Sequence, residues 1–258
     1  MANIHTQLEQ RILLLDGAMG TMISTQNLQE EDYRGAQWQT HDCDLKGNHD
    51  CLSLSKPEAI EQVHRAYLEA GADIIETNTF NANAISQSEY QLQSHVLEMA
   101  TKSAQLARKL ANEYSAKTPD KPRFVAGVLG PTNQTLSLSP DVEDPGFRKI
   151  SFDQLVEAYS QSIEGLVAGK VDVIFIETIF DTLNAKAAIY ACLSYFEAHN
   201  ITLPIALSVT ITDASGRTLS GQTIEAFWNS IAHAKPLWVG INCALGAEKM
   251  APYVDRLS

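Results

Sequence analysis

Residues 171–181 read VDVIFIETIFD, and this stretch decides the fold. Its first part is short, rich in Val and Ile, and lacks the strict alternation of a half-exposed strand, which is typical of a strand buried on both faces of a parallel sheet. A polar sequence, ETIFD, follows at once from Glu177. Apolar runs of the same kind occur at residues 12–15, 72–75, 124–129, 205–210 and 237–241.

Longer amphipathic segments separate these runs. The segment that begins at Pro57 places Ile60, Val63 and Leu68 on one face, and Gly71 follows as a C-terminal stop signal. Further helices are expected at residues 87–114, 152–168, 182–199, 223–233 and 247–257. Six β/α units in series predict a parallel sheet with helical crossovers.

The motifs at the strand ends favour a (β/α)8 TIM-type barrel over a doubly wound open sheet. Five of the six runs lead into a polar or Gly-rich motif: DGAMG from Asp16, ETNTF from Glu76, GPTN from Gly130, ETIFD from Glu177 and NCALG from Asn242. A doubly wound sheet concentrates its chemistry at one switch point, whereas a barrel gathers the carboxyl end of every strand around one mouth.

The number of units is smaller than a closed barrel requires. About six of eight units are recognisable, because long connections at residues 17–56 and 131–150 use the length that usually suffices for eight. Either the sheet is not a closed barrel, or residues 1–258 are one barrel domain that is incomplete at the C-terminus. An open sheet would leave edge strands unpaired and apolar side chains uncovered, so we expect the second.

Composition excludes several classes of function. The 258 residues are 45% hydrophobic, and 19 Lys and Arg against 31 Asp and Glu give a net charge of -12, which disfavours nucleic acid as a partner. No apolar run approaches the ~18 residues of a membrane span, and the N-terminus lacks the features of a signal peptide. The four cysteines are too scattered for a disulfide scaffold. We therefore expect a cytoplasmic protein without membrane contact.

Cys243 and three carboxylates are the candidate functional side chains. Cys243 ends the sixth run and should face the mouth, although a free cysteine is as often a small buried residue. Asp16 and Glu177 at strand ends could hold an amine, bind a metal or act as acid and base, or could only cap helices. For Glu76 the capping or salt-bridging role is favoured.

Other patterns carry no functional signal. The segment 41–51, HDCDLKGNHDC, matches no compact zinc pattern, and we expect a polar, hydrated loop. Cys192 should be a packing residue in mid-helix. The Gly17–Gly20 turn lacks the full dinucleotide fingerprint, and no P-loop occurs.

Taken together, the motifs resemble one family. The stretches LLLDGAMGTMI, DLKGNHD, GADIIETNTFNAN, GPTNQTLSLSPDVEDPGF, FIETIFDTLNAKAA, DASGRTLSGQT and VGINCALG resemble the homocysteine-binding module of cobalamin-dependent methionine synthases. The shorter pieces DGAMGT, ETNTF and GINC are shared by homocysteine S-methyltransferases in general. The GPTN…SPDVEDPGF and ETIFDTLNAKAA stretches resemble the cobalamin-dependent branch in particular.

The resemblance implies a barrel whose mouth holds a catalytic zinc on three cysteines. One of them is Cys243, and the other two form an adjacent pair in a G-G-C-C-type motif that does not occur in residues 1–258. It further implies that Asp16, Gly17, Ala18, Glu177 and Asn242 hold homocysteine. The activity would be transfer of a methyl group from methylcobalamin to the homocysteine thiolate, which gives methionine. Cobalamin and folate would bind to other modules of the parent protein.

Three alternatives stay open. The chain could be a cobalamin-independent homocysteine methyltransferase that uses a sulfonium or betaine donor, or a non-catalytic fragment that lacks the zinc site. Carboxylates at strand ends also fit a glycoside hydrolase with Glu177 as the acid. The tryptophans at positions 38, 228 and 238 do not lie at strand ends, where aromatic sugar platforms are usual, which weighs against the hydrolase.

Overall fold

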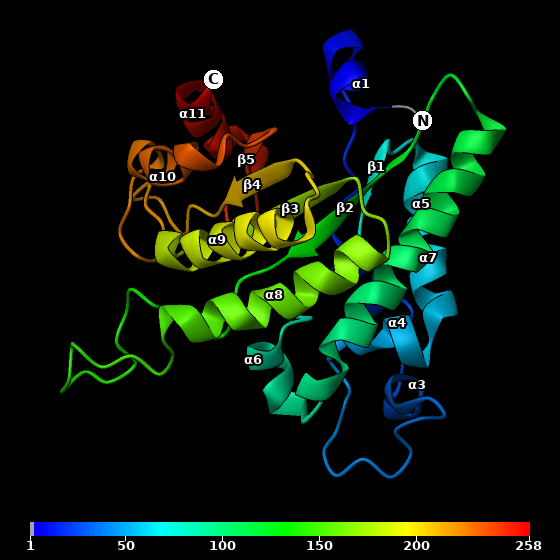
Figure 1. Ribbon diagram of the computed structural model, residues 1–258, viewed down its shortest axis with the longest axis horizontal. Coiled ribbons are helices and arrows are strands. Elements are labelled where there is room, and N and C mark those ends of the chain that lie inside the picture. Colours follow the sequence, from blue (N-terminus) through cyan, green and yellow to red (C-terminus); the bar gives the residue numbers. More distant parts are fainter. Residues whose placement is uncertain (1–2) are drawn as a thin grey trace.

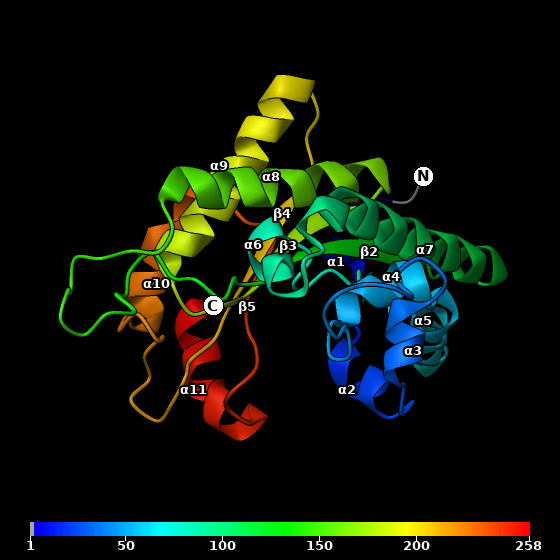
Figure 2. The ribbon, with the colours of Figure 1, turned by 90° about the horizontal axis from the view of Figure 1, so that it is seen from below.

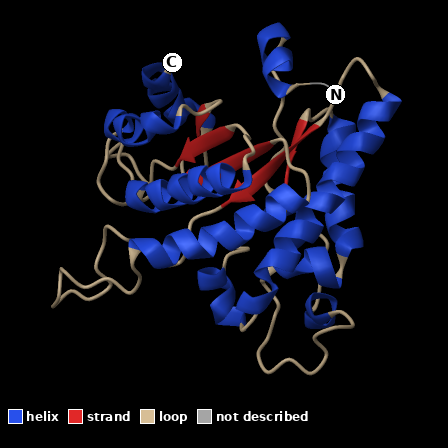
Figure 3. Cartoon of the chain, viewed as in Figure 1, coloured by secondary structure: helices blue, strands red, loops and turns tan. Residues whose placement is uncertain are grey.

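The computed structural model describes residues 3–258 and shows an all-parallel, five-stranded sheet covered by helices (Figure 1). The strands follow one another in space in the order of the sequence, which confirms the series of β/α units. They are β1 (Ile74–Glu76), β2 (Phe124–Leu129), β3 (Val173–Ile179), β4 (Ile205–Val209) and β5 (Val239–Ile241). The sheet curls into a half-barrel, with one face concave and the other packed against helices (Figures 2 and 3).

The prediction of a strand over residues 12–15 is wrong about its length. Only Leu15 pairs, through a single parallel bridge to Ile74. The backbone of Leu14 accepts hydrogen bonds from Asp73 and Ile74, and the Asp16 N–H donates to the Ile74 carbonyl at 2.9 Å. The segment therefore lies beside β1, where a first barrel strand belongs, and it delivers Asp16 to the carboxyl edge of the sheet.

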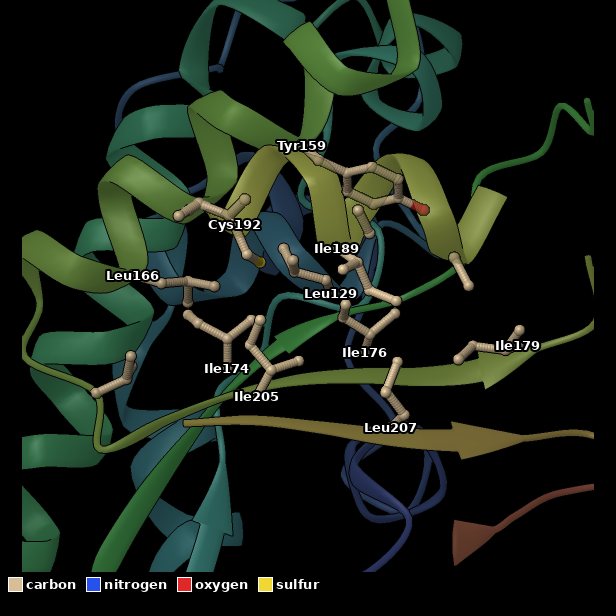
Figure 4. Packing of buried hydrophobic residues seen from close by; sticks show 14 of the residues in the cluster. Leu129, Tyr159, Leu166, Ile174, Ile176, Ile179, Ile189, Cys192, Ile205 and Leu207 are labelled. Carbon is tan, nitrogen blue, oxygen red and sulfur yellow. The ribbon is translucent and has the colours of Figure 1, made fainter. Parts of the chain in front are cut away.

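Long helices cover the convex face and bury the main core. Residues from β2 to β4 pack there against helices α8 and α9 (Figure 4). Close contact of neighbouring helices depends on Gly165, where an added Cβ would lie 2.6 Å from Ala100. The helices on this face are α5 (Pro57–Ala70), α7 (Val96–Lys117), α8 (Phe152–Ala168), α9 (Thr182–His199), α10 (Ile224–Ile231) and α11 (Ala247–Leu257).

Most helix boundaries agree with the sequence, and one does not. The predicted bounds of α8, α9 and α11 are confirmed to the residue; Ser151 and Asp181 cap the first two. The helix expected from residue 87 begins only at Val96. Before it lie the short helix α6 (Ala84–Gln87) and two 3₁₀ turns, separated by Gln91 in the left-handed conformation with φ of 54°. A non-glycine residue in that conformation interrupts helical hydrogen bonding.

The long connection after Asp16 forms a compact subdomain with its own buried residues. Leu45, Cys51 and Leu52 are fully buried, and the Asp50 carboxylate is buried where it accepts a hydrogen bond from the Asn81 N–H at 2.9 Å. The prediction for residues 41–51 is correct for the loop that exposes Asp42, Asp44 and Lys46, and wrong for Asp50 and Cys51, which contacts from distant segments bury. The helices of the connection are α2 (Met19–Ser24), α3 (Glu30–Arg34) and α4 (Leu52–Ser55).

The concave face has its own apolar cluster. Ile74, Val128 and Phe175 point into it from three strands, and Ile4 of helix α1 (Ile4–Gln10) joins them with an exposed fraction of 4%. Among the described residues, no helix is both long and apolar enough to cross a membrane.

Candidate functional site

The concave face opens into a cavity of about 1190 Å³ that reaches the carboxyl ends of the strands. Strand geometry explains which side chains enter it, because successive residues of a strand point to opposite faces. On β3, Phe175 lies in the inner cluster and Ile176 in the outer core, so Glu177 points inward. On β1, Ile74 is inside and Ile75 outside, so Glu76 also points inward.

Three carboxylates, Asp16, Glu76 and Glu177, therefore lie together at the mouth. Asp16 is held by the Glu76 N–H, which donates to its Oδ2 at 3.0 Å, while its Oδ1 is buried without a partner among residues 3–258. None of the salt bridges within residues 3–258 involves any of the three. These three acidic groups therefore lie together without an ion-pair partner in the described part of the chain.

Burial raises the pKa of each carboxyl group, and repulsion by neighbouring carboxylates adds to the shift at Asp16 and Glu76. Burial, and then the charge of Glu177, raises the pKa of Asp16 to about 8. Burial raises the pKa of Glu177 to about 7. Burial, followed by the charges of Glu177 and Asp16, raises the pKa of Glu76 well above its usual value. A cationic ligand would reverse these shifts, because an opposite charge favours the ionised form.

Glu76 is the candidate to which sequence reasoning assigned the wrong role. The capping or salt-bridging role favoured for it is not what its contacts show, since its side chain lines the cavity beside Asp16. The signal was present: Glu76 begins ETNTF directly after an apolar run, just as Glu177 begins ETIFD.

Asn242 connects Glu177 to Cys243. Its Nδ2 donates to Glu177 Oε2 at 3.2 Å, to Thr178 Oγ1 at 2.8 Å and to Cys243 Sγ at 3.4 Å. Its Oδ1 accepts from the Ser208 hydroxyl at 3.0 Å and from the Thr178 N–H at 3.3 Å. With both ends of the amide engaged inside the protein, Asn242 is placed to orient its neighbours.

The backbone is strained where these residues meet. Thr178, Cys243 and Ala244 have φ values of 56°, 59° and 35°, in the left-handed region that side chains other than glycine rarely adopt. For a β-branched residue such as Thr178 this conformation is a genuine outlier. Such strain costs of order 1–3 kcal/mol per residue and clusters at functional sites. Here it brings the Thr178 hydroxyl to 3.7 Å from the Cys243 sulfur.

The remaining predicted residues lie at the same mouth. Gly17 and Ala18 line the cavity, and the ring of Tyr67 packs so closely on Gly17 that an added Cβ would lie 3.0 Å from its hydroxyl oxygen. The structure thus brings together all the residues proposed from the sequence: Asp16, Gly17, Ala18, Glu177, Asn242 and Cys243.

The thiols differ sharply in exposure. Cys243 is exposed, whereas Cys51 and Cys192 are fully buried, the latter in the main core as expected. Cys43 is half-buried and donates to the Tyr90 carbonyl. Within residues 3–258 no three His, Cys, Asp or Glu side chains are grouped so that they could hold a metal ion. Cys243 is thus the single thiol at the mouth, and the described residues do not complete a three-thiolate zinc site around it.

Fold and site together define a (β/α)-type enzyme scaffold with an acidic, thiol-bearing pocket at the carboxyl ends of its strands. The family profile described as Homocysteine S-methyltransferase matches residues 13–258. The chain therefore belongs to the homocysteine S-methyltransferase family.

Solved structures agree with this fold. The metallated form of the homocysteine methyltransferase MmuM from Escherichia coli matches with a TM-score of 0.73 and 23% identity, over 98% of this chain and 83% of that chain. Its apo form matches with a TM-score of 0.66 and 22% identity, over 97% and 80%. The oxidised form gives 0.61 and 18%, over 98% and 100%.

Proposed function

We propose that this chain binds homocysteine at the mouth of the half-barrel and holds its thiol for methylation, with methylcobalamin as the donor and methionine as the product. Residues 1–258 would belong to a single homocysteine-binding barrel domain. The observation that supports this most is the meeting of three unbalanced carboxylates with one exposed cysteine at the carboxyl ends of adjacent strands.

The acidic cluster suits the ammonium group of an amino acid. Asp16 Oδ1 is a buried acceptor with no donor in the described chain, and leaving such a group unpaired costs about 1–3 kcal/mol. An ammonium group that enters the cluster donates to this oxygen and offsets the repulsion among Asp16, Glu76 and Glu177. The Gly17–Ala18 turn, which resembles the family's substrate turn, would receive the carboxylate of homocysteine at the same wall of the cavity.

Cys243 would supply one thiolate ligand of a zinc ion. A thiol with an ordinary pKa of ~8.5 is mostly protonated near neutral pH, and zinc removes the proton from a coordinated thiol. The residues described here do not form a complete site, and the family's adjacent cysteine pair does not occur in residues 1–258. What this chain itself contributes is orientation: Asn242 and Thr178 fix the Cys243 sulfur beside Glu177.

The choice of donor rests on the resemblance to the cobalamin-dependent branch. The stretches at residues 130–147 and 175–188 support that branch over a cobalamin-independent enzyme with a sulfonium or betaine donor. Cobalamin- and folate-binding modules of a parent protein would then be the partners. The non-catalytic alternative is favoured by the incomplete metal site of the described residues.

Calorimetry with homocysteine tests the proposal directly. We expect the 258-residue chain to bind homocysteine. The substitutions Asp16→Asn and Glu177→Gln should each weaken binding at least tenfold, because each removes a charge that faces the ammonium group. Glu197→Gln, at an exposed position of α9, should bind as the wild type does. Absence of binding by the wild type, or equal binding by Asp16→Asn, would contradict the proposed function.

Metal content and turnover separate the alternatives. Near one zinc per chain, lost in Cys243→Ser, together with methionine formation from free methylcobalamin, would support the zinc-dependent enzyme. Zinc that persists in Cys243→Ser would contradict the role of Cys243 as a ligand. Homocysteine binding without zinc or turnover would identify a substrate-binding module that is not catalytic by itself.

A further inference from the structure

One imidazole lies in the wall of the cavity, outside the acidic cluster. Within residues 3–258 two basic side chains line the cavity, Arg11 and His49. Arg11 donates to both carboxylate oxygens of Asp73, at 2.8 and 2.9 Å, so its charge is already matched. His49 takes part in no salt bridge of the described chain. It is therefore the basic group of the wall that is left for a ligand.

The position of His49 is fixed by its neighbours. The residue begins the 3₁₀ turn η1 (His49–Cys51), and its ring stacks on the ring of Tyr33, with 6.2 Å between the centroids and 25° between the planes. Its carbonyl accepts from Asn78 Nδ2 at 2.8 Å, which ties it to the segment after β1 that also carries Glu76. An imidazole that is held in this way loses little conformational freedom when a ligand binds.

The ring nitrogens of His49 are free to bond a ligand. Within residues 3–258, the hydrogen bonds of His49 involve only its backbone N–H and carbonyl. Burial lowers the pKa of His49, so the ring is neutral near pH 7 and has one N–H to donate.

The edge of the ring that contains Nδ1 faces Gly20. A Cβ added to Gly20 would lie 3.5 Å from Nδ1 and 3.8 Å from Cε1. The missing side chain therefore leaves a space about the size of a methyl group in front of Nδ1. Gly20 and His49 both line the cavity, along the wall that begins with the Gly17–Ala18 turn.

The charges in the cavity determine which group suits this donor. Asp16, Glu76 and Glu177 attract the ammonium group of an amino acid and repel its carboxylate, so the carboxylate must point away from the cluster. An N–H donor on the wall outside the cluster is what such a carboxylate requires, and a hydrogen bond to an ionised acceptor is stronger than one between neutral groups.

We propose that His49 binds the α-carboxylate of the substrate through its imidazole N–H, and so makes the site selective for amino acids over simple aminothiols. This inference deepens the proposed function and rests on it, because it takes homocysteine to be the ligand of the mouth. The acidic cluster then selects the ammonium group, and His49 adds selection for the carboxylate to that of the Gly17–Ala18 turn.

Calorimetry with three ligands tests this assignment. Homocysteine carries a carboxylate, an ammonium group and a thiol, whereas 3-amino-1-propanethiol lacks the carboxylate and 2-aminobutyrate lacks the thiol. We expect His49→Ala to weaken the binding of homocysteine and of 2-aminobutyrate about tenfold or more, and to leave that of 3-amino-1-propanethiol unchanged. Asp16→Asn should weaken the binding of all three, because each carries the ammonium group. Displacement titrations against homocysteine measure the weaker ligands.

Two further variants separate the N–H donor from the ring. An asparagine amide places an N–H close to the position of Nδ1, so His49→Asn should restore most of the binding that His49→Ala loses. A loss that arises from the missing contact with Tyr33 would persist in His49→Asn. Gly20→Ala keeps the imidazole but fills the space in front of it, and should weaken homocysteine binding by a similar factor.

The matched control is His233→Ala, at an exposed position of the 3₁₀ turn η4 (Ala232–Ala234) outside the cavity lining, which should bind every ligand as the wild type does. Circular dichroism checks that each variant is folded.

Each contrary result has a distinct meaning. Equal binding of homocysteine by His49→Ala and the wild type, with Asp16→Asn still impaired, rejects the role of His49 alone. An equally large loss for 3-amino-1-propanethiol would overturn it as well, because the ring would then act on the thiol or the ammonium group. Failure of the wild type to bind homocysteine rejects the proposed function and this inference with it.

Discussion

At the mouth, the carboxyl group of Asp16 links the proposed substrate site to stability. Its pKa is about 8 in the fold against 3.8 ordinarily, so the ligand-free fold binds this proton more tightly than the unfolded chain does. The contribution of Asp16 to the free energy of unfolding is therefore largest below about pH 4 and decreases as the pH rises towards 8. Each pH unit over which one such proton is retained corresponds to about 1.4 kcal/mol.

Asp16→Asn should flatten this dependence. We expect urea unfolding to show a smaller loss of stability between pH 5 and pH 8 in the variant than in the wild type, because the amide does not ionise. The exposed Glu197→Gln serves as the control and should keep the wild-type slope. Equal slopes in Asp16→Asn and the wild type would show that Asp16 does not hold a proton in the ligand-free fold.

His64 contributes a pH dependence of stability with the opposite sign to that of Asp16. Its side chain is fully buried on α5, neither ring nitrogen has a hydrogen-bond partner in the described part of the chain, and burial lowers its pKa to about 4. Between about pH 6.5 and 4 the unfolded chain takes up a proton that the fold does not, so stability is present above this window and is lost as the pH falls through it. His64→Leu should gain about 1–2 kcal/mol relative to the wild type at pH 5, and less at pH 7.5. Thermal unfolding at both pH values checks this, with the exposed His5→Leu as the control.

Among the elements, the N-terminus of α9 is bonded both to its own helix and to the loop after β2, through Asp181. Asp181 caps the Leu183 N–H at 2.9 Å and also accepts from the Ser137 hydroxyl at 2.6 Å, in addition to two backbone N–H groups of the loop. Asp181→Ala should lower the free energy of unfolding by about 2–4 kcal/mol, more than the ~1 kcal/mol of an ordinary cap, because it leaves several buried donors unpaired. Urea unfolding measures this.

Proteolysis distinguishes release of the loop from loss of the cap. Asp181→Ala should speed trypsin cleavage after Arg148 and Lys149, whereas Ser151→Ala, which removes only the cap of α8, should not. If both variants were cleaved at the same rate, the anchoring role of Asp181 would be wrong.

The elements also show where sequence reasoning succeeds. Periodicity and local caps suffice for α8 and α9, since Ser151 and Asp181 act within their own helices. They fail for residues 84–95, where Gln91 adopts a left-handed conformation that its residue type does not announce. They fail again at Asp50 and Cys51, because contacts with Asn81 and Tyr33, far away in sequence, bury these two residues.

The sequence allowed prediction of those site residues that directly follow strands, because the ends of parallel strands converge. Asp16, Glu177 and Cys243 follow apolar runs, and the topology brings such ends to one mouth. The orienting role of Asn242 was not predictable, because it depends on the side-chain geometry of Thr178 and Ser208. The strained backbone at Thr178 likewise arises from the tertiary fold and not from local preference, which disfavours that conformation for a β-branched residue.

On the scale of the whole molecule, the open concave face determines how the chain behaves in solution. A cavity of about 1190 Å³ has Val128, Phe175 and Trp238 in its wall, so a dye specific for apolar surfaces should bind to the native chain. Ile4 covers part of this face from α1. Ile4→Ala removes most of that cover, and we expect a loss of roughly 1–3 kcal/mol in stability together with brighter dye fluorescence before unfolding.

Dye titration at 25 °C, followed by thermal unfolding, checks both parts of this prediction. Thr6→Ala, at an exposed position of the same helix outside the cavity lining, should change neither quantity appreciably. A wild type that unfolds cooperatively and binds no dye would mean that the concave face is covered in solution, and the apolar cluster around Phe175 would then have found a partner. If dye binds and homocysteine does not displace it, the apolar wall and the acidic mouth are separate parts of one cavity, as their residues indicate: the wall lies along the strands, and the carboxylates lie at their ends.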